Sequence, residues 1–189
     1  MGKDAYLVLE NGRVFSGKSF GAVRDVVGEI VFTTAMTGYL ETLTDPSYYG
    51  QMVVQTFPLI GNYGVIPSDF ESSDPKLKAY IVREWCQEPS NFRSEGDLDT
   101  FLKTRGIVGI YGIDTRELTR IIREHGVMNA KIKYVQDVDE ADMEEIRSYR
   151  IEDAVNSVTC NEVLRSGKNG IRSIRLHRHT GEEYRIPRY

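Results

Sequence analysis

The sequence predicts an α/β fold with a mixed β-sheet, helices packed on one side of that sheet, and a β-hairpin at the start. Short apolar segments rich in β-branched residues come first, and helical spacing of apolar residues begins only near residue 94. From there helices and strands alternate, which favours helices on a mixed sheet over a doubly wound parallel sheet. The 189 residues, 40% of them hydrophobic, suffice for one large domain or for one domain with an appendage.

The opening hairpin is predicted by Asn11-Gly12, which separates two apolar segments. Asn-Gly is typical of tight hairpin turns in which both turn residues have positive φ. Residues 36–50 combine Gly, Pro, hydroxyl and aromatic side chains, so we expect a compact ordered loop there. Within that loop, Asp45-Pro46 starts a turn and presents Ser47. Apolar, β-branched or alternating segments predict strands at 28–34, 51–57, 77–85, 107–111 and 127–133.

Helices are predicted at three places in the second half. The first is capped by Ser94 or Asp97 and stops at Gly106. The second begins at Asp114, where the capping-box spacing lets the Asp114 carboxylate accept from the Glu117 amide while the Glu117 side chain reaches back. It ends at a glycine, as helices commonly do. The third is an acidic helix over 139–149, with Met143 and Ile146 facing the core.

Composition excludes several classes of function. The net charge of −4 argues against a general affinity for nucleic acid. The sequence has no run of about 18 apolar residues that would predict a membrane span, and its start lacks the apolar stretch of a secretory signal. We therefore expect a cytoplasmic protein with reduced thiols. The charge is uneven, however, because residues 1–160 carry 17 Lys and Arg against 25 Asp and Glu, whereas 161–189 carry 7 against 3.

The cysteines and histidines give no sign of catalysis or of a metal site. Cys86 has acidic and aromatic neighbours, which do not activate a thiol, and Cys160 lacks the flanking glycines of a nucleophile turn. His125 is expected to act as a helix C-terminal cation. His177 and His179 alternate in the basic tail without a third ligand at a suitable spacing. From the residues alone, Ser47 is more simply a turn residue than a functional one.

Six motifs in order resemble a known family, the small, glutamine-using subunit of carbamoyl phosphate synthetase, over residues 5 to about 133. They are Leu9-Glu-Asn-Gly-Arg13, Gly28-Glu-Ile-Val-Phe-Thr-Thr-Ala-Met-Thr-Gly-Tyr39, Leu43-Thr-Asp-Pro-Ser-Tyr48, Phe57-Pro-Leu-Ile-Gly-Asn-Tyr-Gly64, Ser90-Asn-Phe-Arg93 and Ile113-Asp-Thr-Arg-Glu-Leu-Thr-Arg120. The resemblance implies a swivelling β/β/α-type domain that docks on a large subunit and helps to wall a glutamine site. Ser47 matches the serine with which the family contacts glutamine.

The resemblance also implies what this chain lacks. In the family, a second half is a glutamine amidotransferase with a cysteine nucleophile, and the large subunit uses two ATP, with Mg, to convert ammonia and bicarbonate into carbamoyl phosphate for arginine and pyrimidine synthesis. No motif of that second half follows here, so we expect no catalytic residue, no metal and no cofactor in this chain, and no glutaminase activity from it alone. The expected partners are the large subunit, the amidotransferase half and glutamine, with neither nucleic acid nor a membrane.

The predicted organisation is a family domain at 1–150 followed by a linker and an atypical basic tail at 151–189. The tail does not continue the family pattern, so we expect a truncated or frame-disrupted chain or a designed fragment. Two other hypotheses stay open at this point. One is a serine hydrolase that uses Ser47 with a distant histidine, and the other is a stand-alone binding module with a basic tail. We further expect the isolated domain to expose apolar surface and to self-associate.

Overall fold

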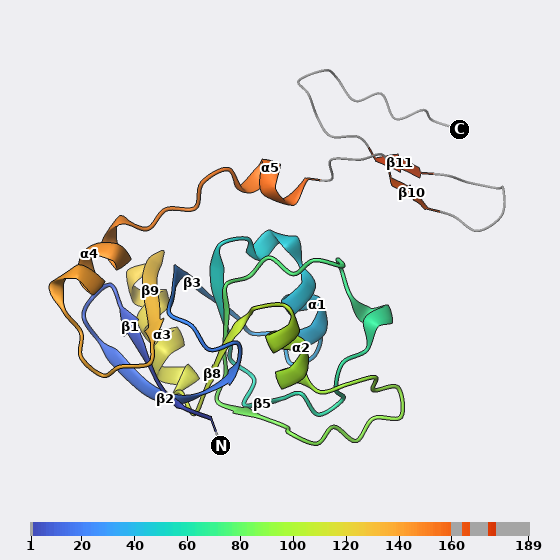
Figure 1. The fold of residues 1–189 in the computed structure, drawn as a ribbon, viewed down its shortest axis with the longest axis horizontal. Coiled ribbons are helices and arrows are strands. Elements are labelled where there is room, and N and C mark those ends of the chain that lie inside the picture. The colour runs from blue at the N-terminus through green and yellow to red at the C-terminus, as the bar shows by residue number, and fades with distance from the viewer. Residues whose placement is uncertain (1, 160–163, 167–173, 177–189) are drawn as a thin grey trace. The chain divides into compact units, whose positions relative to one another are not determined.

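The computed structural model describes residues 2–159, 164–166 and 174–176, and it divides into two compact units, Met1–Glu152 and Asp153–Tyr189. The first unit contains the barrel (Figure 1). In the second unit the described elements are helix α5 (Ala154–Val158) and the antiparallel pair β10 (Leu164–Ser166) and β11 (Ile174–Leu176). The basic tail predicted from the sequence therefore lies almost wholly outside the described residues.

Seven strands of the first unit form a closed barrel in the order β1-β2-β8-β6-β4-β3-β9. Their bounds are β1 Asp4–Leu9, β2 Val14–Gly21, β3 Val26–Thr33, β4 Gln51–Gln55, β6 Ala79–Ile81, β8 Val108–Tyr111 and β9 Met128–Lys133. The pairs β3–β4, β4–β6 and β6–β8 are parallel and the others are antiparallel. A separate parallel pair joins β5 (Leu59–Ile60) to β7 (Glu84–Trp85).

The helices of the first unit are short. They are α1 Tyr39–Thr44, α2 Leu98–Thr104, α3 Thr115–His125 and α4 Glu140–Ser148, with 3-10 turns η1 at Pro46–Tyr48 and η2 at Pro67–Asp69. Asp97 caps α2 and Asp114 caps α3, each accepting a hydrogen bond from a backbone N–H of the first turn. These caps confirm two predicted helix starts. The capping box at Asp114 is not formed, because the Glu117 side chain pairs with Arg13 at 2.9 Å instead.

The predicted α/β class and the opening hairpin are confirmed, but the arrangement of the sheet and helices is corrected. The hairpin has a three-residue loop, in which Gly12 has a φ of 83° and Asn11 is not in the positive-φ region. The amide of Gly12 donates to the carbonyl of Leu9, and Leu9 donates to Arg13, which is the geometry of a type I turn followed by a bulge. The sheet is not open, because β1 pairs with β9, the last strand of the barrel along the chain, and closes the barrel.

Helices also lie on more than one side of the sheet. Helix α3 contributes Leu118, Ile121 and Ile122 to the core cluster that contains the barrel residues Leu7, Ile30 and Met52. Helices α1 and α2 belong to a second cluster with Val53 and Tyr80, which face away from the first. Strands β4 and β6 are therefore buried on both faces. Alternation along a strand shows that a face is buried, but it does not show which helix covers it.

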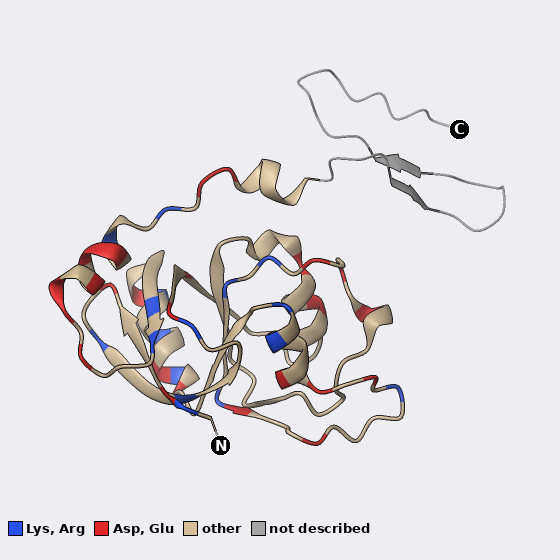
Figure 2. Ribbon diagram, viewed as in Figure 1, with Lys and Arg blue, Asp and Glu red and all other residues tan. Residues whose placement is uncertain are grey.

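Helix α4 covers the outer side of β9 with a buried charged cluster rather than with apolar residues alone. Asp142, not Met143, shares the buried face of α4 with Ile146. Its carboxylate accepts hydrogen bonds from Lys131 and from Lys133. Figure 2 shows basic positions on β9 beside the acidic helix. The alternation of Ala130 and Ile132 inward with the two lysines outward lets β9 serve the apolar barrel and this ion cluster together.

Two further expectations needed correction. The segment 36–50 is not wholly a loop, because Tyr39–Thr44 forms helix α1, with Leu40 and Leu43 fully buried. The predicted strand 77–85 is two short strands, β6 and β7, which belong to different sheets. In both cases the segment is too short for the periodicity of its apolar residues to distinguish helix, strand and loop.

Candidate functional site

Ser47 lies exposed at the centre of the 3-10 turn η1, in the place where the sequence predicts a turn. Asp45 caps this turn, because its carboxylate accepts a hydrogen bond from the Ser47 amide at 2.8 Å. The amide of Tyr49 donates to Pro46 at 3.1 Å, which closes the turn. The Ser47 hydroxyl makes no hydrogen bond to any described residue, so it is free to donate to one ligand atom and accept from another.

The far end of this loop is Gly50, which several groups hold in place. Its amide donates to the carbonyl of Lys76 at 3.3 Å, and its own carbonyl accepts from the Tyr149 hydroxyl at 2.8 Å. Gly50 has a φ of 76°, and a Cβ placed there would lie 2.9 Å from the Tyr149 hydroxyl oxygen. Only glycine fits this combination of backbone conformation and close approach.

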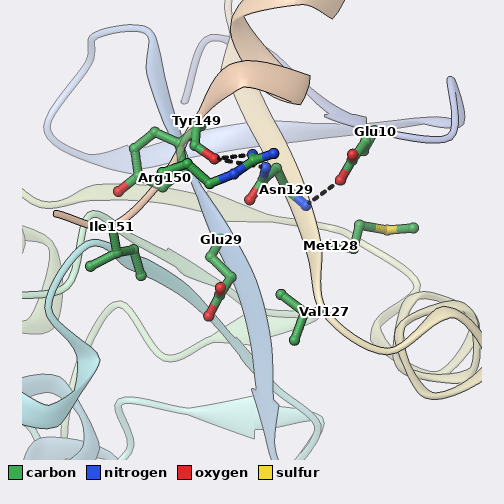
Figure 3. A pocket seen from close by; sticks show the side chains of 8 residues that line it. All are labelled: Glu10, Glu29, Val127, Met128, Asn129, Tyr149, Arg150 and Ile151. Atoms are coloured by element: carbon green, nitrogen blue, oxygen red, sulfur yellow. Dashed lines mark hydrogen bonds between the residues drawn. The ribbon is translucent and has the colours of Figure 1, made fainter.

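A polar cavity of about 230 Å³ lies beside this end of the loop. It is lined by Glu10, Glu29, Val127, Met128, Asn129, Tyr149, Arg150 and Ile151 (Figure 3). Glu10 accepts a hydrogen bond from the Asn129 amide at 3.0 Å, and Glu29 accepts one from Gln51 at 2.6 Å. Because Gln51 follows Gly50 directly, this hydrogen bond links Glu29 of the cavity wall to the residue next to the Ser47 loop.

The segment 149–151 that lines this cavity is anchored on β9. The side-chain amide of Asn129 donates to the carbonyls of Ile146 and Tyr149, at 3.0 and 3.2 Å. Figure 3 shows Asn129 between Glu10 and the Tyr149 carbonyl. Lys78 lies 4.7 Å from the centre of the Tyr149 ring, and burial lowers the pKa of that lysine. The site thus places two carboxylates, an arginine and a serine loop at one end of the barrel.

A second cavity, of about 220 Å³, is aromatic rather than charged. It is lined by Met36, Thr37, Tyr39, Gln55, Phe57, Leu59, Ile60, Asn62 and Tyr63. The rings of Tyr39 and Tyr63 stack with centroids 4.1 Å apart, and burial raises the pKa of both hydroxyls. The Tyr39 hydroxyl donates to the Gly64 carbonyl at 2.6 Å. The two neutral tyrosines, held by stacking and by this hydrogen bond, form one wall of the cavity. Met36, at the rim of the same cavity, is 74% exposed.

The structure places the remaining candidates as follows. Cys86 is half-buried after β7, and its thiol donates to the Glu88 carbonyl at 3.2 Å. His125 occupies the last turn of α3, with Nδ1 3.0 Å from the Ile121 carbonyl oxygen. Cys160, His177 and His179 lie outside the described residues. The structure therefore brings neither Cys86 nor His125 into a hydrogen bond with Ser47.

The described residues contain no group of three or more His, Cys, Asp or Glu side chains placed to hold a metal ion. The same part of the chain contains no helix whose length and apolar character would let it cross a membrane.

Sequence reasoning missed Gly50 and Tyr149. Any loop glycine can be expected to adopt a positive φ. The sequence does not indicate, however, that a tyrosine 99 residues further along the chain contacts Gly50. Tyr149 was expected only as the end of a helix. The one usable signal was the position of Gly50, directly before an apolar strand and after a turn built on Asp45-Pro46.

Comparison with known proteins agrees with the resemblance found in the motifs. The family described as carbamoyl-phosphate synthase small chain, CPSase domain, matches residues 7–132. The carbamoyl phosphate synthase small chain of Clostridium perfringens is 50% identical over 84% of this chain and 45% of its own length. That of Syntrophotalea carbinolica is 52% identical over 84% of this chain and 43% of its own. The carbamoyl phosphate synthase pyrimidine-specific small chain of Halalkalibacterium halodurans is 56% identical over 67% of this chain and 35% of its own length.

The chain thus spans less than half the length of these curated relatives. Among solved structures, the aminopeptidase from Aneurinibacillus sp. strain AM-1 covers 70% of this chain and 30% of its own, with a TM-score of 0.42 and 18% identity, a likeness too low to bear on function. The family match runs from within β1 to within β9 and includes the loop that carries Ser47. On that match, and on identities of 50% and above, the chain belongs to the carbamoyl-phosphate synthase small chain family and corresponds to its CPSase domain.

Proposed function

We propose that this chain serves as the N-terminal domain of the small subunit of a glutamine-hydrolysing carbamoyl phosphate synthetase. In that role it docks on a large subunit and completes one wall of the glutamine site. The observation that carries the proposal is the family match over residues 7–132, with relatives that extend beyond the matched part. The complete enzyme would be a ligase that makes carbamoyl phosphate from glutamine, bicarbonate and two ATP.

Ser47 is the residue that we assign to glutamine. Its hydroxyl is exposed, it has no described hydrogen-bond partner, and the Asp45 cap holds its backbone. A hydroxyl that both donates and accepts suits the ammonium and carboxylate end of an amino acid. We assign Ser47 binding and not nucleophilic attack, because no described base contacts it to remove its proton. The serine-hydrolase hypothesis therefore has no support from the geometry.

The chemistry of bond cleavage would come from the other components. The amide of glutamine would be hydrolysed in the amidotransferase half, and the ammonia would be used in the large subunit, where ATP and Mg would bind. This chain would hold neither cofactor nor metal. The products of the assembly would supply arginine or pyrimidine synthesis, and one relative bears a pyrimidine-specific name. The proposed complex is a heterodimer of small and large subunits in the cytoplasm.

The test reconstitutes the assembly. The chain is combined with the second half of the Clostridium perfringens small chain and with its large subunit, and carbamoyl phosphate formation is measured with glutamine and, separately, with ammonia. We expect glutamine-dependent activity that requires this chain. Ser47→Ala should raise KM for glutamine about tenfold, the effect of losing a hydrogen bond to a charged group, and leave the ammonia-dependent rate unchanged.

Ser68 supplies a matched control. It also follows a proline in an exposed 3-10 turn, η2, but it is bonded to Asp69 and Arg93. Ser68→Ala should leave KM for glutamine unchanged. Absence of binding to the large subunit at micromolar concentration, or equal effects of the two serine substitutions, would contradict the proposal. Ammonia released from glutamine by this chain alone would contradict the assignment of catalysis to the other half.

A further inference from the structure

The segment that follows helix α4 returns to the loop that carries Ser47. Tyr149 ends the helix, and Asn129 fixes both Ile146 and Tyr149 through their carbonyls. Asp142 holds the body of the same helix on β9 through Lys131 and Lys133. Tyr149 is therefore attached to a well-anchored part of the barrel and can act as a fixed reference point for whatever its side chain contacts.

The Tyr149 side chain contacts the end of the Ser47 loop. Its hydroxyl donates to the Gly50 carbonyl at 2.8 Å, and the ring lies below Lys78, whose Nζ is 4.7 Å from its centre. The backbone before β6 also pairs with this region, because the Lys78 amide donates to the carbonyl of Gln51, the residue after Gly50, at 2.8 Å. Gly50 is thus held at two atoms, its amide by the Lys76 carbonyl and its carbonyl by the Tyr149 hydroxyl.

Only three peptide units separate Gly50 from Ser47, and each is constrained. The Tyr48 amide donates to the Asp45 carbonyl at 3.3 Å, the Tyr49 amide to Pro46 at 3.1 Å, and the Gly50 amide to Lys76 at 3.3 Å. Because every peptide unit of this short loop is hydrogen-bonded, the position of Gly50 is coupled to the position of Ser47. A shift of Tyr149 would reach the Ser47 hydroxyl through these contacts.

We propose that Tyr149 is a positioning residue for Ser47, acting through the hydrogen bond from its hydroxyl to the Gly50 carbonyl. The inference rests on the proposed role of Ser47 in holding glutamine. Tyr149 also lies three residues before the end of the first unit at Glu152. The same contact therefore links the glutamine-binding loop to the segment by which the chain leaves the barrel, so a displacement of 149–152 would alter glutamine affinity.

The first test uses the 189-residue chain. Tyr149→Phe removes the hydroxyl and keeps the ring that contacts Lys78. Tyr134→Phe is the matched control, because Tyr134 also donates its hydroxyl to a carbonyl of the barrel, that of Ala22 at 3.4 Å. Amide hydrogen exchange is measured by mass spectrometry. We expect amides 47–50 to exchange about fivefold faster in Tyr149→Phe than in the wild type, which corresponds to the loss of one hydrogen bond. In Tyr134→Phe the exchange rates of these amides should be unchanged. Equal exchange in both variants would overturn the proposal.

The second test uses the reconstituted assembly and separates the two proposals. Tyr149→Phe should raise KM for glutamine about threefold to fivefold, with kcat and the ammonia-dependent rate unchanged. If Tyr149 acts through Ser47, Tyr149→Phe should add nothing to KM in a Ser47→Ala background. Additive effects would overturn the positioning role while Ser47 kept its assignment. If Ser47→Ala itself leaves KM unchanged, the glutamine role of Ser47 fails, and with it the functional consequence of the Tyr149 contact.

Discussion

The Asp142 carboxylate on α4 accepts a hydrogen bond from Lys131 on β9 at 2.7 Å, and both residues are less than a tenth exposed. Lys133 donates to the other carboxylate oxygen. One aspartate thus pairs with two lysines that project from the outer face of the barrel, and Glu145 supplies a second carboxylate to Lys131. Because a buried charge without a partner is costly, this pairing helps to hold α4 on β9, together with the Asn129 hydrogen bonds to the end of the helix.

Asp142→Asn is expected to lower the free energy of unfolding by about 3 kcal/mol, because it leaves two lysines without their shared counter-charge. Urea unfolding at pH 7 measures the change. Glu145→Gln is the matched control, since Glu145 also pairs with Lys131 but its side chain is 56% exposed. That change should cost less than about 1 kcal/mol. Equal effects of the two substitutions would show that burial does not govern this cluster.

The same cluster predicts a pH dependence. Hydrogen bonds from Lys131 and Lys133 hold the pKa of Asp142 well below its ordinary value. A carboxylate whose pKa is lowered in the folded state contributes stability above its unfolded pKa, and this contribution is lost as the pH falls toward the folded pKa. The difference in the free energy of unfolding between the wild type and Asp142→Asn should therefore be constant from about pH 7 to 5 and shrink below about pH 4. A constant difference down to pH 3 would contradict the assignment.

Gly50→Ala should destabilise the barrel and loosen the Ser47 loop. The positive φ alone costs a side-chain-bearing residue about 1–2 kcal/mol, and the new Cβ would meet the Tyr149 hydroxyl. Gly106→Ala is the control for backbone strain, since Gly106 has a φ of 67° with open space around it. Thermal unfolding should show the larger loss for Gly50→Ala, with partial recovery when Tyr149→Phe is added. Equal losses at the two glycines would argue against the close contact.

Exposed apolar residues at the rim of the aromatic cavity predict self-association. Met36, Phe57 and Leu59 are 74%, 39% and 43% exposed, and all three line that cavity. Clustered apolar surface of this kind is typical of faces that pack against another protein. Light scattering should show association at high concentration that Phe57→Ser reduces. Val135→Ser, at an exposed valine outside the cavity, should have no effect, and a monomer at all concentrations would contradict the prediction.

Features governed by neighbouring residues could be predicted from the sequence. The caps at Asp97 and Asp114, the hairpin at Gly12 and the exposed turn at Ser47 each depend on residues within about four positions along the chain. Hydrogen bonds from backbone amides to a side-chain oxygen a few residues away have nearly the same geometry in every protein. The spacing of the residues alone therefore predicts these hydrogen bonds. The resemblance to the family then added the expectation that Ser47 binds glutamine, which spacing does not contain.

Features set by distant pairs could not be predicted. The pairing of β1 with β9 and the bond from Tyr149 to Gly50 join residues about a hundred or more positions apart. Asp142 illustrates the difficulty, because an acidic residue in an acidic helix is ordinarily assigned to the solvent face. Its burial is explained only by the two lysines on β9, whose outward direction follows from a barrel closure that the local pattern does not reveal.

The pairing of β1 with β9 also has a kinetic consequence. Leu7 meets Ile132 across that seam, so the first strand to leave the ribosome finds its second neighbour only after most of the domain has been synthesised. Ordering so long an intervening stretch carries a large entropic cost before the contact is gained, and such topologies fold slowly. The hairpin of β1 and β2 therefore has an unpaired edge until β9 has been synthesised. During that time the nascent chain is most prone to aggregation.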